Sequence, residues 1–320
     1  MWELNKICGG RELQILGWHV LHDWGLVKKF GLETQALKAW LAHVQSCYLP
    51  CQFHSATHAA DVLQTTHYML KTGKMSAYLS EMEILAILVA AMVHDMGHDG
   101  FTNNYHKNAV TSRAIVYNDQ SIQEMYHVST FFATMKDTEN INILQSFSSK
   151  QFLEFRSMVI KLVLATDMSQ HFQELKDFKA LISEKGASPE AWSDSTVHLM
   201  KFVLHSCDIS AQGKARHLAI NWAERCHEEF FNQGDKEKEM QLPVSPLCDR
   251  MTTDIGTSQD GFISFIVLPT WTTLGDLFPA VHEDSLPQLK SNLEYWKSKI
   301  AVSTLEPTKT PASPAKKDAK

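Results

Sequence analysis

The 320-residue sequence lacks several features, and each absence excludes a class of protein. Basic charge is not in excess, because 30 Lys and Arg stand against 36 Asp and Glu, for a formal net charge of −6. DNA- and RNA-binding domains are normally basic, so we expect no nucleic-acid partner. The longest apolar run, residues 84–93, is about half as long as a membrane span requires. The polar residues 1–6 do not resemble a secretory signal peptide.

Paired cysteine spacing is also missing. A turn at residues 49–50 separates Cys47 from Cys51, and no second pair completes a disulfide framework or a zinc finger. We therefore expect the six cysteines to be free, buried or partly buried thiols. Free thiols are typical of a reducing compartment, so a cytoplasmic location is predicted.

Alternating strand patterns and internal repeats are absent as well, whereas helical periodicity is frequent. One helix face is formed by Leu37, Trp40, Leu41, Val44 and Tyr48. The apolar run 84–93 follows two acidic residues, which favours a buried helix from residue 81 to residue 93. Similar spacing recurs near residues 159–166, 197–203, 222–231 and 286–300. These patterns predict an all-α, compact multi-helix domain spanning residues 1–305.

Two stretches are predicted to be irregular. Residues 232–259 contain two glycines, two prolines and many polar side chains, which indicates a long functional loop. Residues 306–320 contain three prolines and four lysines without apolar periodicity, and we expect a disordered tail.

Histidine is the residue that the sequence has in abundance. There are 16, and seven of them lie between His54 and His127. Histidine transfers protons near neutral pH and commonly binds metal ions. The cluster is therefore where chemistry is expected.

Three short motifs offer metal ligands, although each also has a structural explanation. His54 and His58 are four residues apart, so a helix would place both on one face, exposed or capping. His94-Asp95 follows the apolar run, and Gly97 would let the chain turn there. Asp208 lies in an apolar helix, or else it caps the next helix.

Together, these motifs supply two imidazoles and two carboxylates. His58, His94, Asp95 and Asp208 form a mixed nitrogen and oxygen set that suits Zn²⁺. One carboxylate could also bridge to a harder, hydrated ion such as Mg²⁺ or Mn²⁺. A pair of metal ions is a common device for displacement at phosphorus.

The order and spacing of six motifs resemble the catalytic domain of class I cyclic nucleotide phosphodiesterases, which include the phosphodiesterase part of rhodopsin–phosphodiesterase fusions. The six motifs are His54/His58, His94/Asp95/His98, Thr166-Asp167-Met168, Asp208-Ile209-Ser210, residues 228–235, and Gln259/Gly261/Phe262. Residues 117–127, which lie between them, are also similar to the family. The resemblance extends from about residue 37 to about residue 296. It implies a fold of about sixteen helices with the site at the bottom of a pocket.

The resemblance also implies roles for individual residues. Four would hold a first metal, taken as zinc: His58, His94, Asp95 and Asp208. Asp95 would also bind a second metal, taken as magnesium or manganese. The water ligands of this metal would be positioned by His98, Glu124 and Thr166, and His127 would be a supporting partner. A hydroxide between the metals would attack the cyclic phosphate of cGMP or cAMP and break the bond to O3′.

Further roles concern the leaving group and the base. His54 would protonate O3′ as general acid, and Glu229 would orient it. The purine would stack on Phe262 and meet the amide of Gln259, in a slot also lined by Ile209 and Phe230.

One departure from the family pattern bears on specificity. Ala211 stands where members that prefer cAMP often have Asn, so we expect cGMP preference or dual specificity. Other departures are Phe53, Asp99, Tyr126 and Cys226, none of which is an expected ligand.

The alternatives are a cAMP-preferring phosphodiesterase, another His-Asp phosphohydrolase acting on nucleotide monophosphates, and a catalytically inactive nucleotide-binding protein. The resemblance is also compatible with a homodimer and with a regulatory or membrane portion outside these residues.

Overall fold

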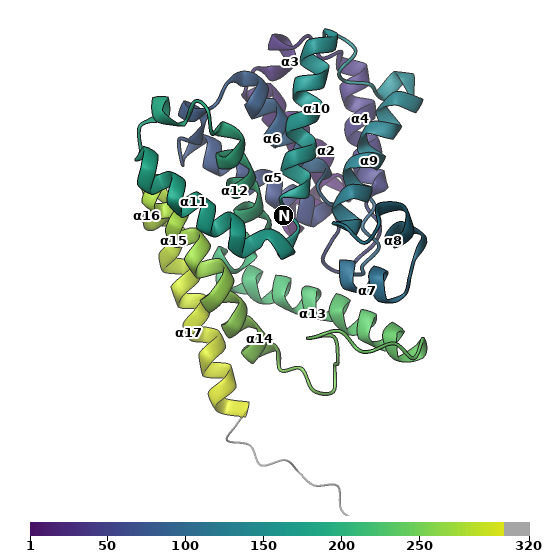
Figure 1. Cartoon of the computed structure of the whole chain (residues 1–320), viewed down its shortest axis with the longest axis vertical. Helices are drawn as coiled ribbons and strands as arrows, with labels where there is room; N and C mark the ends of the chain where they lie inside the picture. Colours follow the sequence, from purple (N-terminus) through teal and green to yellow (C-terminus); the bar gives the residue numbers. More distant parts are fainter. Residues whose placement is uncertain (304–320) are drawn as a thin grey trace, which may run out of the picture.

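The computed structural model describes residues 1–303, a bundle of α-helices joined by loops and short 3-10 turns (Figure 1). The all-α prediction is confirmed, because no β-strand occurs between residues 1 and 303. The first helices are α1 (Trp2–Cys8), α2 (Glu12–Asp23), α3 (Leu26–Lys29), α4 (Thr34–Cys47), α5 (Ala56–Lys71), α6 (Glu81–Val93), α7 (Asn103–Asn108), α8 (Ser112–Tyr117) and α9 (Ile122–Asp137). The others are α10 (Ser149–Leu164), α11 (His171–Lys185), α12 (Thr196–Asp208), α13 (Arg216–Glu239), α14 (Ile255–Phe262), α15 (Leu268–Leu277), α16 (Pro279–Asp284) and α17 (Leu286–Ser303).

Helix α6 is the centre of the hydrophobic core. It begins with a capping box, in which Ser80 and Glu83 satisfy each other's backbone N–H groups. Every side chain from residue 84 to residue 93 is buried, and burying each large one contributes about 1.5–3 kcal/mol. Helices α2, α5 and α10 pack around it (Figure 1). The residues that follow α6 are thus held at the end of a helix that is buried in the core.

The chain turns sharply after α6, as expected. Gly97 adopts φ +79°, a left-handed conformation that favours glycine. A β-carbon there would also lie 2.9 Å from Cε1 of Tyr126. This turn keeps His94, Asp95 and His98 close together.

The prediction of a loop over residues 232–259 is wrong at both of its ends. Helix α13 continues to Glu239 and α14 begins at Ile255, so only residues 240–254 are irregular. Gly234 lies inside the helix, where the loop packs directly against it. Only glycine leaves room for this contact, because a β-carbon there would lie 1.9 Å from the carbonyl oxygen of Cys248. The fully buried Glu237 fixes the same loop, accepting hydrogen bonds from the N–H and hydroxyl of Ser245 at 2.7 and 2.6 Å.

Other expectations concern the whole chain. No helix within residues 1–303 combines the length and apolarity that crossing a bilayer requires. All six cysteines are free, as predicted. The predicted disordered tail, residues 306–320, lies outside the described residues.

Candidate active site

Four side chains from three parts of the chain meet in one cluster. His58 comes from α5, His94 and Asp95 follow α6, and Asp208 ends α12. One ligand atom from each lies within 4.8 Å of all the others. His58 Nε2 is 2.8 Å from Asp208 Oδ1, and His94 Nε2 is 3.2 Å from the same oxygen. The structure therefore brings together the four residues that the sequence suggested as a set.

The chemistry of the cluster fits a cation. His94 Nδ1 lies 3.0 Å from the carbonyl oxygen of Ala91, which only an N–H donor satisfies, so Nε2 is the ring nitrogen that faces the carboxylates. His94 Nε2 faces Asp95 Oδ2 at 3.1 Å, a buried oxygen with no hydrogen-bond partner among residues 1–303. An imidazole nitrogen this close to a buried carboxylate oxygen needs a positive charge between the two, supplied by a proton or by a metal ion.

The pKa shifts within the cluster also indicate that it favours a bound positive charge. Burial alone would raise the pKa of Asp208, but the facing His94 and His58 lower it well below its ordinary value. Burial alone would lower the pKa of His94, yet Asp95 and Asp208 raise it well above the usual range. The carboxylates are thus ionised in a buried site that favours positive charge.

The structural explanations for two of the motifs are not supported. The residue at the N-terminus of the turn after α12 is Ile209, and the Asp208 carboxylate instead contacts the two imidazoles. His54 is not on a helix face with His58, because α5 begins at Ala56 after the cap residue Ser55. The two rings nevertheless lie 6.0 Å apart between centroids.

Two more histidines lie beside the cluster. His98 Nδ1 accepts the N–H of Gly100 at 3.0 Å, so its Nε2 carries the proton and is a donor. His127 is buried, with Nδ1 2.9 Å from the carbonyl oxygen of Met96 and Nε2 3.9 Å from Asp95 Oδ1. Burial lowers the pKa of His127 to about 4, so this imidazole is neutral.

Glu124 and Thr166 are also buried polar groups. Burial and the nearby Asp167 and Asp95 raise the pKa of Glu124 to about 7, although Asn103 donates a hydrogen bond of 2.9 Å to it. The Thr166 hydroxyl donates to the carbonyl of Val163 at 2.8 Å, which leaves its oxygen free to accept. Both groups can therefore bind water.

His54 and Glu229 form an ion pair through His54 Nδ1. The second Glu229 oxygen accepts the backbone N–H groups of Phe53 and His54 at 2.9 and 3.2 Å, which fixes the carboxylate. Burial alone would lower the pKa of His54, but Glu229 raises it to about 9. His54 also stacks on His98, with ring centroids 3.9 Å apart. His54, His98 and Glu229 could themselves hold an ion, but the hydrogen bonds among them suit a charged proton donor.

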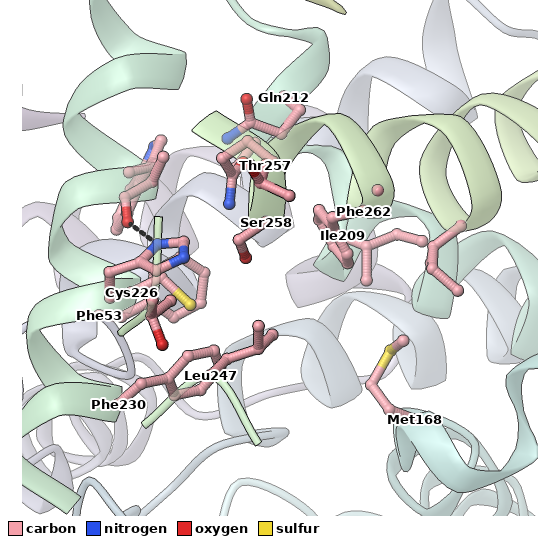
Figure 2. Close-up of a pocket in the computed structure, with 18 of the residues that line it drawn as sticks. Phe53, Met168, Ile209, Gln212, Cys226, Phe230, Leu247, Thr257, Ser258 and Phe262 are labelled. Carbon is pink, nitrogen blue, oxygen red and sulfur yellow. Dashed lines mark hydrogen bonds between the residues drawn. The ribbon is translucent and has the colours of Figure 1, made fainter. Parts of the chain in front are cut away.

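A cavity of about 890 Å³ opens beside the cluster. His54 and Asp208 line it, together with the five residues expected to bind the nucleotide, namely Ile209, Ala211, Phe230, Gln259 and Phe262. Figure 2 shows Phe53, Cys226, Phe230 and Leu247 on one side of the cavity, and Ile209, Phe262 and Met168 on the other. The Oε1 atom of Gln259 is buried and has no hydrogen-bond partner among residues 1–303.

Sequence reasoning missed part of the cavity wall. Trp222, Leu247 and His227 line the cavity, yet none belongs to a motif with a chemical role. Trp222 packs on Phe53 and on Trp2 of α1, with ring centroids 5.3 and 4.5 Å apart. Aromatic residues at helical spacing are equally typical of a core, so the sequence held no signal that placed them here.

Comparisons with known proteins agree with one another. A family model described as 3′5′-cyclic nucleotide phosphodiesterase matches residues 53–288. The probable 3′,5′-cyclic phosphodiesterase pde-1 of Caenorhabditis elegans is 38% identical over 294 residues, which cover 91% of this chain and 43% of that protein. The human dual specificity calcium/calmodulin-dependent 3′,5′-cyclic nucleotide phosphodiesterase 1C is 39% identical over 279 residues, 87% of this chain and 38% of that protein.

A solved structure is similar over nearly the whole chain. The phosphodiesterase domain of the RhoPDE fusion protein from the choanoflagellate Salpingoeca rosetta matches with a TM-score of 0.86 at 28% identity, covering 92% of both chains. The chain spans less than half the length of the two curated relatives above.

Proposed function

The chain belongs to the 3′,5′-cyclic nucleotide phosphodiesterase family, and from this premise we propose that it hydrolyses cyclic nucleotides to 5′-monophosphates. The proposal rests on one observation: the buried His/Asp cluster, which needs a cation, lies at a cavity that is lined by both Asp208 and His54. A nucleotide in this cavity would place its phosphate at the cluster and its base toward Gln259 and Phe262.

The family is metal-dependent, and we propose that His58, His94, Asp95 and Asp208 hold Zn²⁺. Asp95 would share a second ion, Mg²⁺ or Mn²⁺. When bound, the ions lower the pKa of water and neutralise the phosphate oxygens. His98 Nε2–H is available to donate to a water beside the cluster. Glu124 and Thr166 offer acceptors for such waters, and the Nε2 acceptor of neutral His127, 3.9 Å from Asp95 Oδ1, would support the same waters.

The proton for the leaving O3′ would come from His54. Glu229 is held by two backbone N–H groups and keeps the imidazole charged above neutral pH. A charged imidazole at the cavity wall is a suitable general acid. Transfer of the proton from Nε2 to O3′ would leave neutral His54, still hydrogen-bonded to Glu229 through Nδ1.

For the substrate, we propose cGMP preference or dual specificity for cGMP and cAMP. The human relative is named dual specificity. Ala211 supplies no side-chain amide to the cavity, and the adjacent Gln212 amide is occupied by Ala219 O and Trp296 Nε1 at 3.1 and 3.2 Å. Without a fixed partner for the adenine edge, discrimination against guanine is weak.

The test is to measure kcat/KM for cGMP and cAMP with purified protein, supplied with Zn²⁺ and Mg²⁺ and then treated with a chelator. Hydrolysis of both, or of cGMP alone, that stops on chelation supports the proposal. A clear preference for cAMP would contradict the specificity assignment. Failure on both cyclic nucleotides, with hydrolysis of nucleotide monophosphates, would favour another His-Asp phosphohydrolase. Absence of both activities and of bound metal would indicate a nucleotide-binding protein without catalysis.

The remaining assignments are part of the same proposal. We assign residues 1–305 to one catalytic domain in the cytoplasm, which the six free thiols favour. The expected partners are the two cyclic nucleotides and a second copy of the chain, with no nucleic acid.

A further inference from the structure

His227 is a cavity residue to which the proposed reaction gives no task. It lies on α13, one residue after Cys226 and three before Phe230, and is among the residues that line the cavity. Only 1% of the residue is exposed. Its Nδ1 lies 2.8 Å from the carbonyl oxygen of Ala223, one turn earlier in the helix, so Nδ1 carries the proton.

The other ring nitrogen has no partner. His227 Nε2 is buried and unpaired among residues 1–303. Burial lowers the pKa of His227, although Ala223 and Asp254 oppose this, so the ring is neutral and Nε2 is an acceptor. A buried acceptor without a donor is costly. The simpler explanation, a histidine packed in the core beside Phe230 and Phe231, accounts for the ring but not for this nitrogen.

Gln259, which lines the same cavity, carries a second buried acceptor without a partner, its Oε1 atom. The base that meets two acceptors best is the one with more donors on its edge. Guanine presents N1–H and a 2-amino group side by side, whereas adenine presents only its 6-amino group beside an acceptor nitrogen. Two unpaired acceptors on residues of one cavity therefore favour guanine over adenine.

We propose that His227 is a specificity-determining residue that accepts a hydrogen bond from the 2-amino group of guanine. This inference rests on the proposed function and names its preferred substrate. In this proposal the two residues bind different groups of the base. Gln259 hydrogen-bonds to N1–H and O6, and His227 accepts a hydrogen bond from the 2-amino group, which guanine has and hypoxanthine lacks.

The test compares cGMP with inosine 3′,5′-cyclic monophosphate (cIMP), which lacks only the 2-amino group. One hydrogen bond to a neutral group is worth about a factor of ten in kcat/KM, so the unaltered protein should favour cGMP over cIMP about tenfold. His227→Met has similar volume but no acceptor, and should bring the ratio to about one by reducing turnover of cGMP alone. His227→Gln keeps an acceptor and should retain part of the ratio. His217→Met, at an exposed position on the same helix, is the matched control.

Binding provides a second readout that does not require turnover. Calorimetry with the products GMP and IMP should show the same ratio and the same loss in His227→Met, and thermal melting checks that each variant folds. Unequal cGMP and cIMP values that survive unchanged in a folded His227→Met protein would overturn the role of His227 but leave the proposed function intact. If the unaltered protein hydrolyses none of the cyclic nucleotides, the proposed function fails, and this inference fails with it.

Discussion

Replacing Glu229 with Gln should shift the alkaline limb of the kcat–pH profile to lower pH. The general acid must be protonated, so activity is present below the pKa of His54 and is lost as pH rises through it. Burial alone would lower this pKa, but Glu229, with smaller contributions from Asp95 and Asp208, raises it from 6.5 to about 9. The difference corresponds to about 3 kcal/mol of stabilisation of the charged imidazole. Gln preserves the size of the side chain and an oxygen for the two backbone N–H groups, but it removes the charge.

The magnitude follows from the fraction of His54 that is protonated. At pH 7.5 a pKa of about 9 leaves roughly 97% of the imidazole charged, whereas a value of about 6.5 leaves roughly 9%. The Gln variant should therefore lose about tenfold in kcat at pH 7.5, and more if burial lowers the pKa further. Most of the loss should be recovered near pH 6.

Initial rates at saturating cGMP between pH 5.5 and 10 provide the assay. Glu228→Gln is the matched control, since its half-exposed carboxylate lies 3.6 Å from Arg250 instead. If the Glu229 variant kept the original alkaline limb and lost activity equally at all pH values, the role of His54 as the proton donor controlled by Glu229 would be refuted.

Three further predictions concern metal and stability. Chelation should abolish hydrolysis and lower the melting temperature, because an ion bound only by the folded state stabilises that state. In the same assays the Asp208→Asn protein should be folded but inactive, and an active variant would exclude Asp208 as a metal ligand. Gly234→Ala should destabilise by about 2 kcal/mol or more, since its β-carbon would lie 1.9 Å from the carbonyl oxygen of Cys248; Gly213→Ala, with nothing within 4 Å, is the control in thermal melts. Ser80→Ala should lower the free energy of unfolding by about 1 kcal/mol in denaturant titrations, because it removes the cap of α6, and kcat should be unchanged. A loss of kcat in the folded variant would contradict this.

Much of the fold could be predicted because its strongest element has the clearest pattern. The apolar run before His94 predicts a buried helix from residue 81 to residue 93, and α6 has those bounds. The loop over residues 232–259 could not be placed correctly, because glycine usually interrupts helices. Gly234 instead permits the carbonyl of Cys248 to approach α13, and a contact between distant residues leaves no local signal.

The residues of the site could be predicted where they belong to motifs with a clear sequence pattern. The motifs that contain His58, His94 and Asp208 carried the family resemblance, which the family match confirms. Their proximity depends on the packing of α5, α6 and α12, which spacing does not encode. His227 could not be found, because a histidine among aromatic residues in a helix is typical of a core. Its unpaired nitrogen is visible only once the backbone is placed.

The most direct test of the account is hydrolysis of cGMP in ¹⁸O-labelled water, followed by mass spectrometry of the product. Attack by water at phosphorus with departure of O3′ predicts 5′-GMP carrying one ¹⁸O atom on its phosphate. A 3′-monophosphate, label in the ribose, or no product in the presence of Zn²⁺ and Mg²⁺ would contradict it.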